Sequence, residues 1–225
     1  MQPAAHAQIT FSEVQEAGEP ARPLEFPPPQ VARGVRVNAL VVDPETGTRQ
    51  VKSGVVHRED LSQGEVLAYA PTKRLQDAIY GSVWSCVVLR RHTGVAADDA
   101  ARAAGVEPGS PQAPFVWELT RNFVAIKMVE WARVHHMRGR LLEDPIKEIA
   151  ALQLLGTGHP HVLGAIEVLQ DGDFLFSVMP FCSGGDLFGL VVQYAEESGG
   201  EIGMPEPVAR YWYRQILCVS LITTE

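Results

Sequence analysis

A short helix with clear start and stop signals, flanked on both sides by β-rich segments, constrains the fold of this 225-residue chain more than any other feature. Asp144 can cap the free N–H groups of the first turn, Pro145 suits the first helical position, and Gly156 can end the helix. The apolar residues between these signals repeat at helical spacing and comprise Ile146, Ile149, Leu152 and Leu155. The sequence therefore predicts a helix between Asp144 and Gly156 with one apolar face.

The segments around this helix favour strands first and further helices later. Four β-rich segments surround it, two before and two after: 79–91, 123–128, 162–169 and 173–181. Two helical patterns follow these strands, at about 186–197 and 205–219. The order of strands, one helix, strands and then helices predicts an α+β fold with an antiparallel sheet.

The rest of the chain divides into a tail, a hairpin and a main domain. Residues 1–34 are rich in proline and hold few large apolar residues, so we expect a disordered tail. Residues 35–72 contain two β-rich runs around the turn signal DPETG and predict a β-hairpin extension. Residues 73–225 form the main domain. Within it, 93–119 is predicted to be an inserted surface loop, because 93–112 is rich in small residues, proline and glycine.

Charge and composition argue against several classes of partner and compartment. The chain has 19 basic and 27 acidic residues, and its net charge of −8 disfavours non-specific binding to nucleic acid or to an anionic membrane. No apolar run approaches the roughly 18 residues of a spanning helix, and the amino terminus lacks a secretory signal. Three widely spaced cysteines, Cys86, Cys182 and Cys218, fit a reducing compartment. We therefore expect an intracellular protein of the cytoplasm or nucleus.

Two features of the sequence indicate a candidate functional site most directly. They are the sequence VAIK, which ends at Lys127, and the later helix that carries Glu148. Taken alone, Lys127 is better explained as a surface lysine at the end of an apolar strand. A lysine aimed by a carboxylate, however, can hold a triphosphate. Together with HPHVLG and FSVMPFCSGGDLF, these motifs make residues 74–217 resemble the amino-terminal half of a eukaryotic-type protein kinase. CSGGDLF favours the serine/threonine branch.

The resemblance implies an amino-terminal lobe with an antiparallel five-stranded sheet and one helix, followed by the first helices of an incomplete carboxyl-terminal lobe. It also implies ATP as the cofactor. Lys127 would hold the α- and β-phosphates and would pair with Glu148. Asp186 would reach the ribose, and Gly81 would be the last glycine of the phosphate loop.

At the adenine end, the resemblance assigns five further positions. Val83 and Ala125 would cover the purine, and Met179 would be the gatekeeper behind it. The backbone groups of Phe181 and Cys182 would meet the adenine edge. No metal site is predicted, because the paired histidines of HPHVLG have no further ligand at suitable spacing.

Two departures from the kinase pattern limit what the resemblance implies. Of the three positions of the glycine-rich loop, Gln76, Ala78 and Gly81, only the last is glycine, which hinders close approach of the backbone to phosphate. No HRD or DFG motif follows Leu217, so no catalytic or magnesium-binding residue is assigned, although the family uses magnesium. We therefore expect a truncated, pseudokinase-like chain that binds ATP but is inactive alone, with an unidentified protein substrate. The alternative is a non-catalytic kinase-like scaffold or regulatory module.

Overall fold

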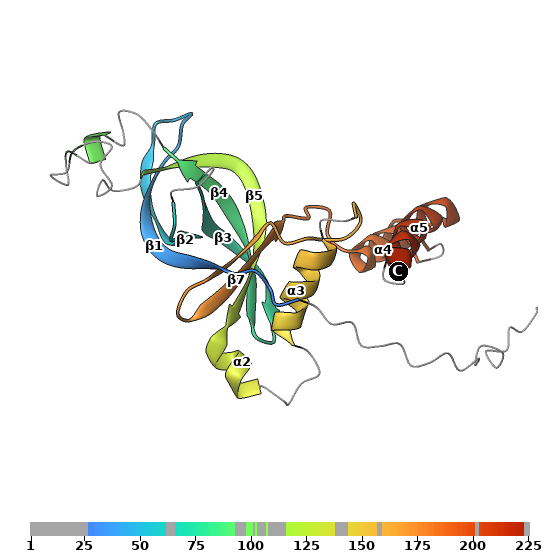
Figure 1. Ribbon diagram of the computed structural model, residues 1–225. Coiled ribbons are helices and arrows are strands. Elements are labelled where there is room, and N and C mark those ends of the chain that lie inside the picture. Colours follow the sequence, from blue (N-terminus) through green and yellow to red (C-terminus); the bar gives the residue numbers. More distant parts are fainter. Residues whose placement is uncertain are drawn as a thin grey trace, which may run out of the picture.

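The computed structural model describes residues 27–61, 66–92, 98–100, 102, 107, 116–137, 144–156, 159–200 and 203–222. Within them, seven strands form a closed barrel with helices outside it (Figure 1). The strands are β1 Ala32–Val42, β2 Arg49–Arg58, β3 Leu67–Ala78, β4 Gly81–Arg91, β5 Val116–Glu130, β6 Glu167–Gln170 and β7 Phe174–Pro180. The longer helices are α2 Trp131–Met137, α3 Pro145–Leu155, α4 Leu187–Glu197 and α5 Glu206–Ile222.

The hairpin of β1 and β2 closes the sheet into a barrel. The strand order is β1-β2-β3-β4-β5-β7-β6, and neighbouring strands of the described chain pair antiparallel except along one edge of β1. On that edge, the start of β1 pairs in parallel with β6, and the end of β1 pairs in parallel with β5.

The predicted α+β class is confirmed, but the prediction of an antiparallel five-stranded sheet is wrong in strand number and strand direction. The reason is a long-range pairing. A sheet of β3, β4, β5, β7 and β6 would leave the outer edges of β3 and β6 open, and exposed edges invite pairing with other strands. The hairpin occupies both edges, β2 beside β3 and β1 beside β6.

Two apolar clusters fill the barrel and tie the hairpin to the later strands. One draws buried residues from every strand between β2 and β7, among them Tyr69, Ile126 and Phe176. The other draws buried residues from β1 to β5, including Val41 and Trp117. The hairpin therefore shares the hydrophobic core of the strands that follow it, and burial of these side chains is the main source of stability.

Helix α3 forms where the sequence predicts it, and its caps are confirmed. Oδ1 of Asp144 accepts hydrogen bonds from two backbone N–H groups of the first turn, and Pro145 is the first helical residue. Gly156 caps the other end, where a Cβ atom would overlap the backbone of Gly164. Ile149 packs against the sheet in a third apolar cluster. The caps set where α3 begins and ends, and the close crossing brings its last turn against Gly164.

Two elements differ from the sequence-based expectation. β5 begins at Val116, inside the range 93–119 assigned to a surface insertion. α2 continues directly from β5 and occupies a stretch for which no element was predicted. Most of the predicted tail, 1–34, and most of the insertion lie outside the described residues.

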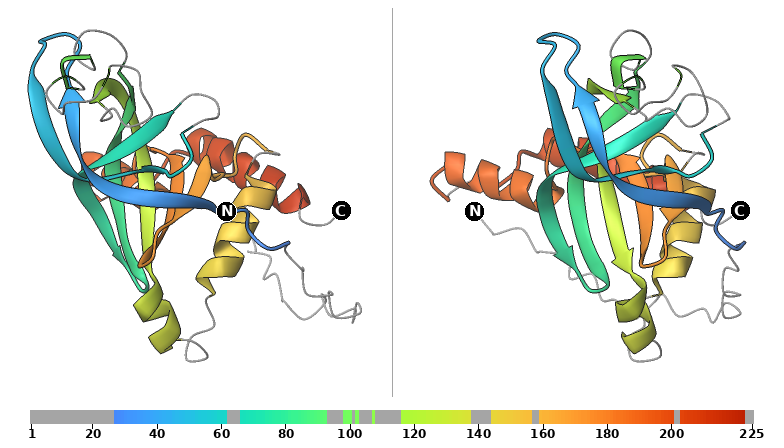
Figure 2. Two further views of the ribbon diagram at one scale, coloured as in Figure 1. Left: turned by 60° about the vertical axis from the view of Figure 1, so that its left-hand side comes forward. Right: turned by 90° about the vertical axis from the view of Figure 1, so that its left-hand side faces the viewer.

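The two carboxyl-terminal helices, α4 and α5, project from the barrel (Figures 1 and 2). Several large apolar side chains on them are exposed, and Phe188 is 78% exposed. None of the helices in the described part of the chain is long and apolar enough to cross a membrane.

Candidate functional site

Four of the predicted nucleotide-binding residues share one face of the barrel wall. Residues directly opposite on antiparallel strands project to the same face, as do residues two apart on one strand. Val83 of β4 lies opposite Lys127, and Met179 of β7 lies opposite Ala125. Because Ala125 and Lys127 are two apart on β5, all four side chains lie on one surface, which we call the β5 face.

Lys127 is held at this face by a two-point ion pair with α3. Its Nζ lies 2.6 Å from Oε1 and 2.7 Å from Oε2 of Glu148. Glu148 lies in the first turn of α3, where the helix dipole favours a negative charge. Both side chains keep contact with solvent. The ammonium group therefore has a fixed position beside an apolar surface and remains accessible.

The segment after β7, residues 181–186, holds the other residues predicted at the adenine end, and we call it the hinge segment. Phe181 packs against Phe123 of β5, with ring centroids 6.4 Å apart. Asp186 caps α4, because its Oδ1 accepts a hydrogen bond from the backbone N–H of Gly189 at 2.7 Å. The hinge segment is thus anchored at both ends, to β5 and to α4.

The turn between β3 and β4, which the kinase resemblance aligns with the glycine-rich loop, is closed tightly. Tyr80 in this turn is 5% exposed and packs in the cluster that contains Ile149 of α3. Its carbonyl oxygen accepts a hydrogen bond from the backbone N–H of Glu130 at 2.8 Å. A Cβ atom at Gly81 would overlap the carbonyl oxygen of Met128, so glycine is required there for packing. The buried position of Tyr80 was not foreseen from the sequence.

A buried hydroxyl lies beside Lys127 and was also missed. Ser177 on β7 lies opposite Lys127, so the two side chains project to the same face. Ser177 is 1% exposed, and its Oγ has no hydrogen-bond partner among the described residues. Buried hydroxyl groups without a partner are rare in folded proteins. The β5 face therefore includes one unsatisfied polar group, and only the strand register could have located it.

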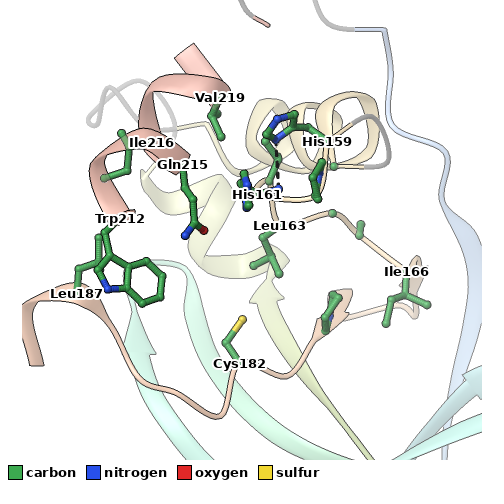
Figure 3. Close-up of a pocket in the computed structure, with 16 residues that line it drawn as sticks. His159, His161, Leu163, Ile166, Cys182, Leu187, Trp212, Gln215, Ile216 and Val219 are labelled. Atoms are coloured by element: carbon green, nitrogen blue, oxygen red, sulfur yellow. Dashed lines mark hydrogen bonds between the residues drawn. The ribbon is translucent and has the colours of Figure 1, made fainter. Parts of the chain in front are cut away.

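A cavity of about 1180 Å³ lies beside the hinge segment and is distinct from the β5 face. Residues 159–166, Cys182, and Trp212 and Gln215 of α5 contribute to its walls (Figure 3). None of the four residues that define the β5 face lines it. The side chain of Cys182 therefore faces this cavity, although its backbone was assigned to the adenine edge.

The described residues offer no ligand cluster for magnesium. Among them, no three His, Cys, Asp or Glu side chains come together in a way that could hold a metal ion. The two histidines of HPHVLG contact each other, since the backbone N–H of His161 donates to Nδ1 of His159 at 3.2 Å. The four residues that define the β5 face combine three apolar side chains with one cation, Lys127.

The comparison with known proteins finds relatives that are protein kinases, although no family model matches the chain. The serine/threonine-protein kinase ATG1a of Arabidopsis thaliana is 31% identical over 77 residues, which are 34% of this chain and 11% of that protein. CBL-interacting serine/threonine-protein kinase 16 of the same plant is 33% identical over 98 residues, or 44% of this chain and 19% of that protein. Part of this chain is protein-kinase-like. Calcium-dependent protein kinase 5 of Plasmodium falciparum (isolate 3D7) agrees, with 31% identity over 74 residues, or 33% of this chain and 12% of that protein.

The chain spans between 11% and 19% of the length of these three relatives. The similarity supports a kinase-related function for the kinase-like part, and protein kinases in general use ATP.

Proposed function

We propose that the kinase-like part of this chain binds ATP on the β5 face. The observation that carries the proposal is the ion pair of Lys127 and Glu148 beside apolar side chains on the same face. The triphosphate of ATP is strongly negative, and a lysine held by a carboxylate presents its charge with little loss of side-chain entropy. A surface lysine without such a partner would have to be ordered when the ligand binds.

The other residues complete the proposed site at its adenine and ribose ends. Val83 and Ala125 cover the purine from one side, and Met179 closes the back. Backbone groups of the hinge segment at Phe181 and Cys182 meet the adenine edge. Oδ1 of Asp186 already caps α4, so its other carboxylate oxygen is the one assigned to the ribose.

Phosphoryl transfer to a protein serine or threonine is the reaction that the kinase resemblance implies, and it requires more than this site. It needs an aspartate to accept the proton of the hydroxyl and ligands for magnesium. No HRD or DFG motif that would supply them occurs in the 225 residues. The polypeptide by itself is therefore expected to bind ATP without phosphorylating a protein.

Thermal unfolding with and without ATP and magnesium tests the binding proposal, because a ligand that binds only the folded state stabilises it. At 100 times the Kd, the stabilisation is about 2.7 kcal/mol. ATP should raise the midpoint of the unmutated protein much more than that of Lys127→Met. Lys147→Met removes the same charge from an exposed position on α3 and should respond like the unmutated protein. An equal shift for Lys127→Met would contradict the assignment.

A second candidate is a non-catalytic kinase-like scaffold or regulatory module, favoured by the turn between β3 and β4. Tyr80 is buried against α3, and Gly81 is required for packing, so this turn is poorly suited to wrap around phosphates. This candidate predicts that saturating ATP leaves the unfolding midpoint of the unmutated protein unchanged.

A further inference from the structure

The residues before β1 are joined to α3 by a reciprocal pair of hydrogen bonds. Nε2 of Gln153 donates to the carbonyl oxygen of Gln30 at 2.7 Å. The backbone N–H of Gln30 donates to Oε1 of Gln153 at 2.8 Å. One carboxamide therefore satisfies both backbone groups of a residue that lies 123 positions away in the sequence.

Gln153 lies on the same helix as Glu148 but on a different side of it. Five residues along an α-helix correspond to a rotation of about 140° around the axis once full turns are subtracted. Glu148 reaches Lys127 on β5, whereas Gln153 reaches the segment before β1. Helix α3 is therefore held by polar contacts from two directions.

A cavity of about 330 Å³ lies where the amino-terminal segment meets α3. Pro27, Pro28 and Gln30 line it together with Ala150 and Gln153 of the helix. The hydrogen bonds between Gln30 and Gln153 join the segment to the helix at this cavity.

The barrel fixes the other end of this link. Gln30 lies two residues before Ala32, the first residue of β1, and Ala32 pairs with Leu169 of β6. Gln30 is therefore tied to a closed sheet, and it can act as a stationary anchor for the helix. We infer that residues 27–31 form a strap that holds α3 where Glu148 pairs with Lys127, and that Gln153 is a positioning residue acting through Glu148.

The expected effect on ATP affinity rests on the proposed function. Weakening the strap lowers the affinity for ATP, because Lys127 loses its fixed position. By linkage, ATP bound at Lys127 also strengthens the strap. The state of the ion pair itself can be measured without nucleotide, however, through the chemical reactivity of Lys127. A lysine in a two-point ion pair reacts more slowly with an amine-acylating reagent than a free one.

The experiment measures the acylation rate of each lysine in the full chain by mass spectrometry, with exposed Lys73 as the internal reference. Gln153→Ala removes both hydrogen bonds, and Gln30→Pro removes the backbone donor while leaving α3 unchanged. Gln30→Pro should raise the rate at Lys127 relative to Lys73 by about five-fold, the effect of one net hydrogen bond, and Gln153→Ala, which loses two, should raise it further. Gln193→Ala removes a glutamine from an exposed position on α4 and should change nothing.

Glu148→Gln calibrates the full loss of the ion pair. An unchanged Lys127 rate in both strap variants, with a raised rate in Glu148→Gln, overturns the strap and leaves the ATP proposal intact. An equal rise at Lys127 and Lys73 also overturns it, because the contact would then only stabilise the fold. An unchanged rate in Glu148→Gln contradicts the ion pair and both proposals. Slower acylation of Lys127 with ATP supports the ATP site separately.

Discussion

Replacing Trp117 by alanine is expected to remove a large part of the stability of the barrel. Trp117 is 1% exposed, packs among buried residues of β1 to β4, and lies against His57 with ring centroids 5.3 Å apart. Truncation of a buried tryptophan costs about 3–5 kcal/mol, from lost apolar burial and from the cavity left behind. Whole domains are stable by only about 5–15 kcal/mol. The free energy of unfolding of Trp117→Ala should therefore fall by at least about a fifth.

Urea unfolding followed by circular dichroism measures this loss without relying on tryptophan fluorescence. Phe123→Ala is the matched control, because Phe123 is an aromatic residue of the same strand with 50% exposure, and its loss should cost about 1 kcal/mol. A cost below about 1 kcal/mol for Trp117→Ala would refute the reasoning. Trp117 would then belong to a surface insertion, as the sequence suggested for 93–119.

Two further predictions concern polar groups of the barrel. Ser177→Ala removes a buried hydroxyl without a partner among the described residues, so the free energy of unfolding in urea should stay level or rise by about 1 kcal/mol. Thr120→Val removes the hydrogen bond from Oγ1 to the carbonyl oxygen of Val88. In the same assay, the free energy of unfolding of this variant should fall by about 1 kcal/mol. The hydrogen bond from Arg90 holds the pKa of Glu118 below its ordinary value of 4.5, so its stabilisation is present above that pH and is lost as the pH falls below it. As the pH is lowered, the free energy of unfolding should therefore fall less steeply for Glu118→Gln than for the unmutated protein. Identical pH dependence of the two proteins would contradict the assignment.

Local signals predicted α3 well because each acts within a few residues of the helix. Asp144 caps the backbone beside it, Pro145 sets the first dihedral angle, and Gly156 ends the helix. These effects do not depend on the rest of the fold. Local hydrogen bonds also shape the turn between β6 and β7, where Oδ1 of Asp171 accepts backbone N–H groups within three residues.

Closure of the barrel could not be predicted in this way, because it depends on pairing between segments far apart in the sequence. The residues that pair β1 with β6 are 137 positions apart, as between Ala32 and Leu169. Trp117 was missed for a related reason. It follows a stretch rich in alanine, proline and glycine, and its partners lie on strands that precede that stretch.

The candidate site was predicted in its residue types but only partly in its geometry. Alternation along β5 was enough to place Ala125 and Lys127 on one face. The approach of Glu148 depends on how α3 packs, and the partnerless hydroxyl of Ser177 depends on the register of β7. Tyr80 was aligned with a phosphate loop, yet its side chain packs against α3, because an apolar ring gains more by burial than by exposure in a turn.

Calorimetric titration of the unmutated protein with ATP and with adenosine tests the central claim most directly. The two ligands share the adenine and ribose, so the difference in their affinities isolates the contribution of the phosphates. If Lys127, held by Glu148, binds the phosphates, ATP should bind about tenfold tighter or more, as expected for one hydrogen bond between charged groups. Equal affinities, or no binding of either ligand, would contradict the claim.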